Sequence, residues 1–258
     1  MYSYVCLNFY TFNLKKIPKM KKLLFSVLIA ASLFSCSNND EEQVLSVADK
    51  KEVSMKNTDG TIVTEIQTEA FEKIISNLKK ANENDKVAYL TANYKDNNGM
   101  MKLISSNAKS SSLTAKSAAQ ITFQYRAHVT GKPENGHGWM PWYPLGTPVG
   151  TMGESRRLEA MQFANGSYLT GFRARAHVQG HGWLSYVGLG EVVGTTGQER
   201  RAEAFQIIVP SDFATQVVYR VYVQNIGWMP YVNNGEIAGT VGQSLRVEAF
   251  QMNMVVIE

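Results

Sequence analysis

The stretch GWMPYVNNGEIAGTVGQSLRVEAF, at Gly227–Phe250, recurs in a chain of 258 residues. The earlier copies are GWMPWYPLGTPVGTMGESRRLEAM at Gly138–Met161 and GWLSYVGLGEVVGTTGQERRAEAF at Gly182–Phe205. All three align without a gap, and the tryptophans of the GW pairs lie 44 and 45 residues apart. A GT pair and then an Arg-x-Glu-Ala segment follow at the same spacing in each copy. Self-similarity at a fixed period indicates a repeat architecture.

The combination of GW, GT-x-G and Arg-x-Glu-Ala, with HVQ or YVQ just upstream, resembles the clostridial hydrophobic W repeat. The resemblance covers roughly residues 121–257. It implies an extracytoplasmic binding or adhesion module, often built from three repeats. It implies neither a known ligand nor catalytic residues.

Each repeat is predicted to open and close with a half-buried strand, because apolar side chains alternate with polar ones. The predicted inward positions of the opening strands are Phe123, Tyr125, Ala127 and Val129, then Phe172, Ala174, Ala176 and Val178, then Val217, Tyr219, Val221 and Val223. The same alternation in the closing strand of the first repeat puts Glu159, Met161 and Phe163 on one face.

These strands predict an all-β domain at residues 119–258, built from three repeats of ~45 residues around a pseudo-threefold axis. Three small units cannot each bury a face alone, so they are expected to share one core. A β-prism fits three small sheets and a β-trefoil is the alternative. In either fold we expect the GW tryptophans to point toward the shared centre as the repeat core: Trp139, Trp183 and Trp228.

The segment Met20–Cys36 reads MKKLLFSVLIAASLFSC, the three-part layout of a secretory signal. Its Leu33–Cys36 ending resembles a bacterial lipobox, which implies lipidation of Cys36 and anchoring to a membrane through that residue. Residues 1–36 are therefore interpreted as an upstream extension and a lipoprotein signal peptide that starts at Met20. The acidic run after Cys36 resembles the surface-export signal of Bacteroidota lipoproteins, and we favour the outer membrane and cell surface over the periplasm.

The net charge of +4 comes from the leader, which contains five lysines and no acidic residue within residues 1–36. The rest of the chain has 21 basic and 22 acidic residues, a net charge of −1, so the composition gives no argument for nucleic acid. The two cysteines are Cys6 and Cys36, so the mature protein is expected to contain no disulfide.

Residues 37–104 are interpreted as a tether or spacer, short and α/β or partly disordered. A helix is predicted at Thr68–Lys80, where Phe71, Ile74, Ile75 and Leu78 have helical spacing. A hairpin is possible from Lys86–Tyr94 and Met100–Ser105. Residues 105–118 have the composition of a flexible linker.

The Arg-x-Glu segments bring an ionisable pair together in each of the three repeats, and we interpret these pairs as structural. An enzyme needs one site with different groups in different roles, whereas these pairs occur three times. They are Arg157 with Glu159, Arg201 with Glu203, and Arg246 with Glu248. The histidines His128, His137, His177 and His181 stand without carboxylates or thiolates at metal-ligand spacing. We expect no enzyme activity, no cofactor and no metal.

A second aromatic residue follows each GW tryptophan by three positions, on the opposite face of a strand. With the arginine on the polar face of each opening strand, it forms the candidate ligand-binding set: Trp142, Tyr186, Tyr231, Arg126, Arg175 and Arg220. The predicted partner is a polysaccharide or a cell-surface protein. Two functions remain open, a glycan- or cell-wall-binding lipoprotein and a protein-interaction or adhesion module that binds no sugar.

Overall fold

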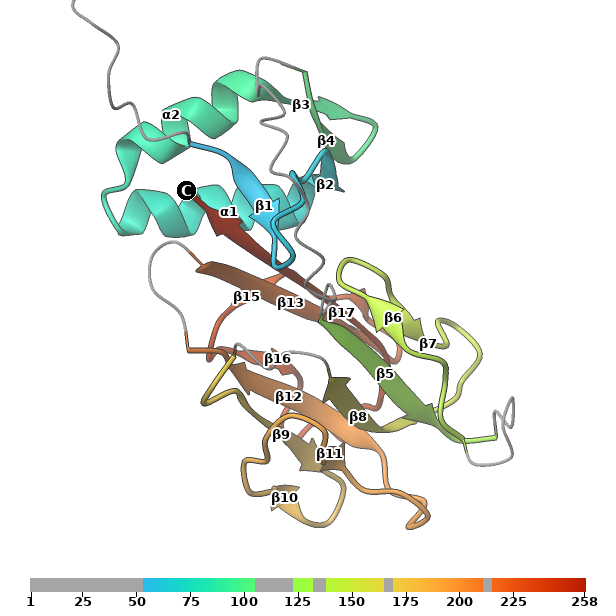
Figure 1. The fold of residues 1–258 in the computed structure, drawn as a ribbon. Coiled ribbons are helices and arrows are strands. Elements are labelled where there is room, and N and C mark those ends of the chain that lie inside the picture. Colours follow the sequence, from blue (N-terminus) through green and yellow to red (C-terminus); the bar gives the residue numbers. More distant parts are fainter. Residues whose placement is uncertain (1–52, 105–122, 132–137, 165–168, 211–214) are drawn as a thin grey trace, which may run out of the picture. The chain divides into compact units, whose positions relative to one another are not determined.

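The computed structural model describes residues 53–104, 123–131, 138–164, 169–210 and 215–258. They all belong to one compact unit, Asp49–Glu258. They form several antiparallel sheets and two helices, with no closed barrel in these ranges (Figure 1). None of the described helices is long and apolar enough to cross a membrane. The predicted signal peptide, the lipidation site Cys36 and the linker 105–118 lie outside the described residues.

Each repeat opens with a strand whose alternate side chains are buried. These strands are β5 (Gln124–Val129), β9 (Arg173–Val178) and β13 (Thr215–Val223). The side chains predicted to point inward are at most 3% exposed in all three. The prediction of the opening strands is confirmed.

The closing strands are β8 (Leu158–Ala164), β12 (Ala202–Ile208) and β17 (Val247–Ile257), each antiparallel to the opening strand of its own repeat. In the first repeat the register shifts by one residue at Glu159, which makes a β-bulge. The bulge turns Glu159 to the polar face, while Leu158, Met161 and Phe163 enter the core. The prediction that Glu159 shares a face with Met161 and Phe163 is therefore wrong. The same shift occurs at the two equivalent glutamates, Glu203 and Glu248.

Short strands connect the opening and closing strands. They are β6 (Tyr143–Pro144), β7 (Val149–Gly150), β10 (Gly182–Trp183), β11 (Val192–Gly194), β14 (Gly227–Trp228), β15 (Val232–Asn233) and β16 (Ile237–Gly239). The last short strand of each repeat pairs with the closing strand of another repeat: β11 with β8, β16 with β12, and β7 with β17. This exchange is cyclic, because the second repeat pairs with the first, the third with the second, and the first with the third. The three repeats are thereby interlocked.

The glycine of the GT pair is required by this exchange. Gly194 has φ +125°, and a Cβ atom there would lie 2.3 Å from the carbonyl oxygen of Glu159 on the neighbouring closing strand. Gly150 and Gly239 meet the carbonyl oxygens of Glu248 and Glu203 in the same way. Only glycine allows the two backbones to approach so closely.

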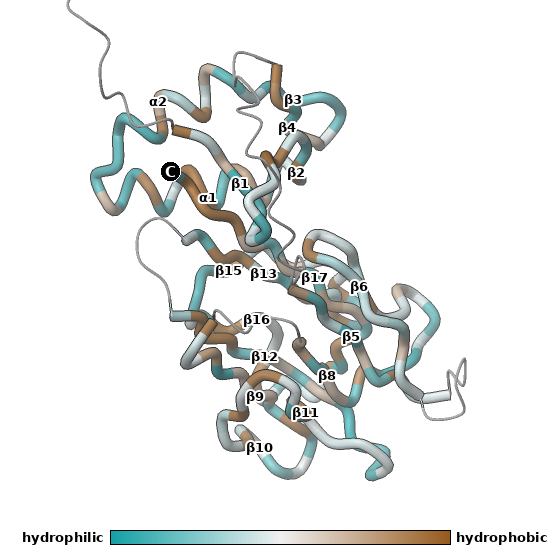
Figure 2. The backbone as a smooth tube through the Cα atoms, in the orientation of Figure 1, coloured by the Kyte–Doolittle hydropathy of each residue, from teal (hydrophilic) through white to brown (hydrophobic). Residues whose placement is uncertain are grey.

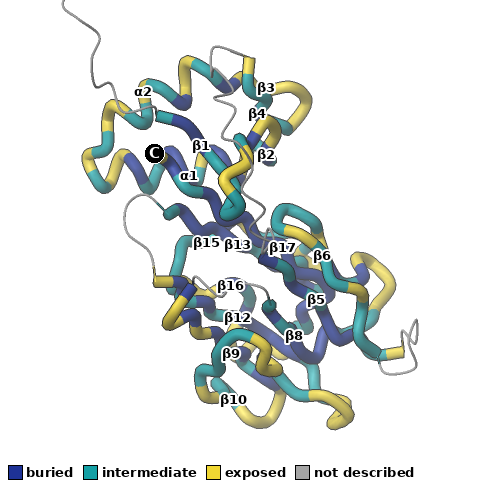
Figure 3. The backbone as a smooth tube through the Cα atoms, in the orientation of Figure 1, coloured by how far each residue is buried: buried dark blue, intermediate teal, exposed yellow. Residues whose placement is uncertain are grey.

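The shared core is built from aromatic rings of all three repeats. The ring of Phe250 lies 5.5 to 6.3 Å, centre to centre, from the rings of Tyr125, Phe163, Phe205 and Tyr219. Figure 3 shows β5, β12 and β17 buried along most of their length. The GW tryptophans are half-buried and lie outside this core, so the prediction that they point to the shared centre is wrong. They pack instead against arginines on the polar faces of the sheets.

The segment before the repeats contains β1 (Met55–Asn57), β2 (Glu65–Gln67), α1 (Thr68–Lys80), α2 (Asn84–Asn93), β3 (Tyr94–Asn97) and β4 (Met100–Leu103). Helix α1 has the predicted bounds and buries the four predicted apolar residues, which confirms that prediction. The hairpin is formed by β3 and β4 only. The residues before Tyr94 are helical, because Val87, Leu90 and Tyr94 are spaced to pack on one side against α1 and its neighbours.

This segment packs on the third repeat, through one strand and one helix. Strand β1 pairs with β17 and extends the third sheet. Helix α1 contacts β13 and β15. A second core joins Phe71 and Ile74 of α1 to Val218 and Val255 of that sheet. Figure 2 shows the hydrophobic end of β17 that this core buries.

Candidate binding site

In every repeat, one arginine of the opening strand lies between two aromatic rings. The guanidinium carbon of Arg126 is 4.8 Å from the ring centre of Trp139 and 4.4 Å from that of Trp142. The equivalent distances are 4.4 to 4.6 Å in the other repeats, where Arg175 lies between Trp183 and Tyr186, and Arg220 between Trp228 and Tyr231. These are cation–π distances, and we call the three groups the arginine stacks. The predicted binding residues of each repeat are thus brought together, with the GW tryptophan added.

A glutamine fixes each stack at the junction between two repeats. Nε of Arg126 donates to Oε1 of Gln162 at 3.0 Å, and Nε2 of Gln162 donates to the carbonyl oxygen of Gly190 in the second repeat at 2.6 Å. The same relay runs through Arg175, Gln206 and Gly235, and through Arg220, Gln251 and Gly146. Burial lowers the pKa of Arg126 from its usual value, but a guanidinium stays charged in a protein.

The first two stacks are open and the third is covered. Trp142 and Tyr186 are half-buried. Tyr231 is only 4% exposed, because it belongs to the core under α1. Glu69 of α1 also forms an ion pair with Arg220. Tyr231, predicted as a candidate ligand-binding residue, is therefore buried and not open to a ligand.

The buried state of Tyr231 is visible in its hydrogen bonds and its acidity. Its hydroxyl donates to Oε1 of Gln251 at 2.9 Å and accepts from Nδ2 of Asn253 at 3.2 Å. Burial raises the pKa of Tyr231 to about 12, although the positive charge of Arg220 acts in the opposite direction. The third stack is therefore part of the packing between the repeats and the N-terminal segment.

Beyond each stack the polar face continues to a buried glutamate. The His128 ring lies edge-on to Trp139 with centres 5.2 Å apart, and its Nδ1 is 3.2 Å from Oε2 of Glu159. The second repeat has the same arrangement, at 5.4 and 3.0 Å, in Trp183, His177 and Glu203. In the third repeat Tyr222 replaces the histidine, and Glu248 accepts the N–H of Gly153 at 3.0 Å.

These histidines pair with glutamates as structural groups. Of the other two, His181 is exposed and His137 lies outside the described residues. Within the described ranges, no group of three or more His, Cys, Asp or Glu residues is arranged to hold a metal ion.

The predicted Arg-x-Glu ion pairs form in all three repeats. Each glutamate is at most 4% exposed, and the shortest N–O distances are 2.7, 2.8 and 2.8 Å. Thr130 also donates its hydroxyl to Glu159 at 2.9 Å. A buried carboxylate requires such partners, since desolvating an unpaired charge is very unfavourable.

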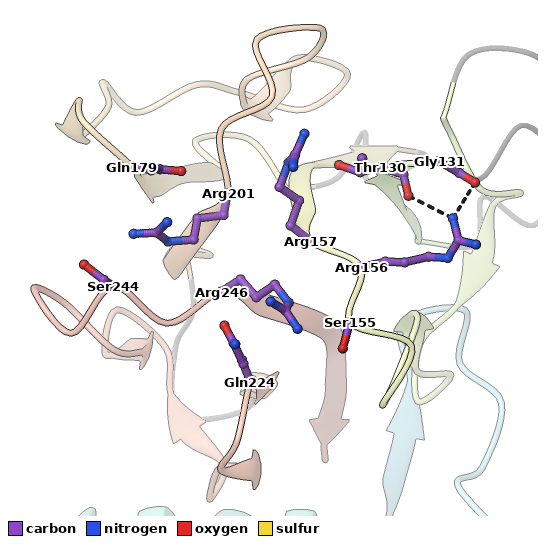
Figure 4. Close-up of a pocket in the computed structure, with 10 residues that line it drawn as sticks. All are labelled: Thr130, Gly131, Ser155, Arg156, Arg157, Gln179, Arg201, Gln224, Ser244 and Arg246. Atoms are coloured by element: carbon purple, nitrogen blue, oxygen red, sulfur yellow. Dashed lines mark hydrogen bonds between the residues drawn. The ribbon is translucent and has the colours of Figure 1, made fainter.

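The arginines of these pairs also line one pocket of about 350 Å³ (Figure 4). Arg157, Arg201 and Arg246 each come from a different repeat. So do Thr130, Gln179 and Gln224, which follow the opening strands. Because equivalent positions of all three repeats line it, the pocket lies where the repeats meet, and we call it the axial pocket.

A fourth arginine, Arg156, lines the axial pocket on the side of the first repeat and breaks its threefold symmetry. Nη1 of Arg156 donates to the carbonyl oxygens of Thr130, at 3.3 Å, and Gly131. Its Nε lies 3.2 Å from Oε2 of Glu154, a half-exposed carboxylate. The third repeat has Leu245 at the equivalent position.

The axial pocket was not predicted from the sequence, because the Arg-x-Glu arginines were interpreted as purely structural. The signal was present in the equal spacing of the three arginines. Equivalent residues of a closed threefold arrangement lie at one height around one axis, so three like side chains near the strand ends can meet there.

Comparisons with curated proteins and with solved structures find no significant match. The family model described as clostridial hydrophobic W matches three segments, residues 135–164, 177–210 and 222–255. These segments contain the three GW pairs, the three GT pairs and the three bulged glutamates. The region is a non-catalytic module, and the chain carries three clostridial hydrophobic W repeats.

Proposed function

We propose that this protein is a cell-surface lipoprotein whose repeat domain binds polysaccharide through the open arginine stacks of the first two repeats. The observation that carries the proposal is the pair of half-buried aromatic side chains, Trp142 and Tyr186, held beside a fixed arginine. An aromatic ring offers an apolar face to a sugar ring, and the arginine offers donors to its hydroxyl groups. We also interpret the cyclic set of three sheets as a β-prism.

Preorganisation supports a binding role for these two stacks. Each arginine is already held by a glutamine that is bonded to the next repeat, at 2.6 Å in the first stack and 2.7 Å in the second. A rigid site loses little conformational entropy when a ligand binds. A stack offers one arginine and two rings, so a single stack is expected to bind weakly.

Two weak sites on one rigid body suit a repetitive ligand. A second contact with the same polymer is intramolecular, so its effective concentration is high and the overall affinity exceeds that of either site. A cell-wall or capsular polysaccharide presents such repeated contacts. Lipidation at Cys36 would hold the domain at a membrane surface, with the outer membrane and cell surface favoured over the periplasm.

The alternative is a protein-interaction or adhesion module. The observation in its favour is the exposed apolar side chains on short strands, Val192 at 40% and Ile237 at 45% exposed. They stand at equivalent positions of β11 and β16. A protein partner would use this apolar surface rather than the stacks.

The test is a pull-down with insoluble cell-wall polysaccharide and the full chain. The variant Trp142→Ala/Tyr186→Ala should lose binding but still unfold cooperatively, with a cost of about 1–2 kcal/mol for each half-buried ring. Ile226→Ala is the matched control, since this apolar side chain is 51% exposed and lies outside the stacks. Normal binding by the double variant, together with loss of a protein partner in Val192→Asp, would favour the alternative.

A further inference from the structure

We propose that the axial pocket is a second binding site, for a compact organic polyanion with three or more carboxylate, sulfate or phosphate oxygens around one centre. It uses the Arg-x-Glu arginines and Arg156. These residues are not part of the open arginine stacks, so the site is independent of the proposed polysaccharide face.

The three paired arginines have donors to spare. Arg201 and Arg246 approach their glutamates through Nε and Nη2. Arg157 uses Nε. A guanidinium carries five N–H donors, so the described bonds leave the Nη1 group of each arginine for a ligand. The side chains are 20 to 27% exposed, which keeps them accessible from the pocket.

The glutamates hold these arginines in place and are themselves satisfied. Glu159 accepts hydrogen bonds from Arg157 and Thr130, and Glu248 accepts them from Arg246 and the N–H of Gly153. The glutamates are at most 4% exposed, so the arginines are the accessible members of the pairs. A carboxylate that already accepts several donors repels an incoming anion less than a free one.

The charge around the pocket favours an anion. Four guanidinium groups line it, while no Asp or Glu is among the lining residues. Arg200 adds a fifth positive charge close by, through its bond of 3.0 Å to the carbonyl oxygen of Gln179. Glu154 on the rim partly offsets Arg156. Planar guanidinium groups suit the paired oxygens of carboxylate, sulfate and phosphate.

The size and symmetry of the pocket define the class of ligand. A volume of about 350 Å³ lies at the lower end of pockets that bind small organic molecules. Arginines from three directions suit three anionic groups on one small scaffold, as in a tricarboxylate. The neutral side chains of Gln179, Gln224 and Ser244 add hydrogen-bonding groups for the hydroxyl groups of such a ligand.

The proposal is tested by calorimetric titration of the full chain with citrate at low ionic strength, followed by inorganic sulfate and phosphate. Citrate should bind once per chain and raise the melting temperature, and the affinity should fall as salt is added. The neutral triethyl ester of citrate should not bind. The proposal is overturned if none of citrate, sulfate and phosphate binds at about 10 mM, roughly ten times the dissociation constant of a weak site.

Two variants link binding to the pocket. Arg156→Gln should weaken citrate binding about tenfold, the loss expected for one charge-assisted hydrogen bond. Arg246→Gln/Glu248→Gln removes both members of an ion pair, so that no buried carboxylate is left unpaired, and should weaken it about as much. Citrate binding that is unchanged in both variants would assign the anion to another surface. Trp142→Ala/Tyr186→Ala should bind citrate normally, so failure of the polysaccharide proposal and failure of this one are distinguishable.

Discussion

The arginine stack of the first repeat is open, whereas helix α1 of the N-terminal segment covers the tyrosine of the third stack. Both stacks have nearly the same geometry, with Arg126 4.4 Å from Trp142 and Arg220 4.4 Å from Tyr231. The difference lies beside the arginine. The third repeat has the buried Val218 where the first has Gln124 and the second has Arg173. One apolar substitution on the outer face thus helps convert a solvent-facing stack into a packing surface.

The comparison also separates the inside of the domain from its outside. On the inside, all three repeats place rings around Phe250 and exchange strands cyclically. On the outside, α1 packs against β13 and β15 of the third repeat. We therefore expect the core to respond alike in all repeats, and the faces to respond differently.

The largest effect is expected from the shared core. Phe250→Ala removes a fully buried ring that contacts the other repeats, and should lower the free energy of unfolding by about 3–5 kcal/mol. Trp183→Ala removes a half-buried ring and should lose less, about 1–2 kcal/mol. Urea unfolding measures both. Equal losses would show that the tryptophan belongs to the core after all.

A smaller effect is expected from the strand exchange between repeats. Gly194→Ala places a methyl group against the backbone of β8 at positive φ, and should lower the free energy of unfolding by about 3 kcal/mol. The matched control is Gly197→Ala, also at positive φ but with no atom within 4 Å of the added Cβ. If both variants lose the same stability in thermal unfolding, the close approach of the two strands is not what requires glycine.

The pH dependence of stability should report the covered face. The folded state raises the pKa of Tyr231 from 10.0 to about 12, so the unfolded chain loses this proton first. The neutral phenol of Tyr231 therefore contributes about 2–3 kcal/mol to the free energy of unfolding; the contribution is fully present below pH 10 and is lost as the pH rises toward 12. Burial raises the pKa of Tyr94 to about 12 as well, so deprotonation of Tyr94 adds to the fall in stability over the same pH range.

Unfolding measured at pH 8 and pH 11 isolates the share of Tyr231. The variant Tyr231→Phe keeps the ring but has no phenol proton, so its stability should fall less between the two values. A fall as steep as in the parent protein would mean that Tyr231 titrates as a solvent-exposed phenol, and that α1 does not cover the stack.

The smallest effect is expected at the edge of the same face. Glu69 pairs with Arg220, but its side chain is 68% exposed, so Glu69→Ala should lower the free energy of unfolding by less than about 1 kcal/mol. Differential scanning calorimetry at low and high salt checks this value. A loss of several kcal/mol would make the ion pair, rather than the apolar core under α1, the main attachment of the helix.

Local periodicity was enough to predict the opening strands and helix α1. Their apolar residues follow periods of 2 and 3.6 without interruption, and the core accepts them in that order. The closing strands break the rule at one residue. The bulge at Glu159 inserts one extra residue into the strand. The inward–outward alternation that holds from Ala160 onward therefore does not extend back to Glu159, and the glutamate turns to the polar face.

The residues of the candidate site could be predicted from the sequence, but the side chains and the helix that pack around them could not. Spacing alone assembled Arg126 with Trp142, since both recur with the repeat. Sequence could not show that Trp139 stacks on the other side of the arginine, because an aromatic residue in a repeat suits a core equally well. The sequence also could not show that α1 covers Tyr231, because this contact is between residues far apart in the chain. Glu69 of α1 and its partner Arg220, for example, are 151 positions apart.

The most direct test of the account is the response of the tryptophan indole N–H signals to an oligosaccharide from the bound polysaccharide. The chain has four tryptophans, and each signal can be assigned by a Trp→Phe variant. The account predicts that the signals of Trp139, Trp142 and Trp183 shift on titration, while that of Trp228, whose partner ring Tyr231 is buried under α1, stays in place. A shift of the Trp228 signal as large as the others, or no shift of any signal, would contradict it.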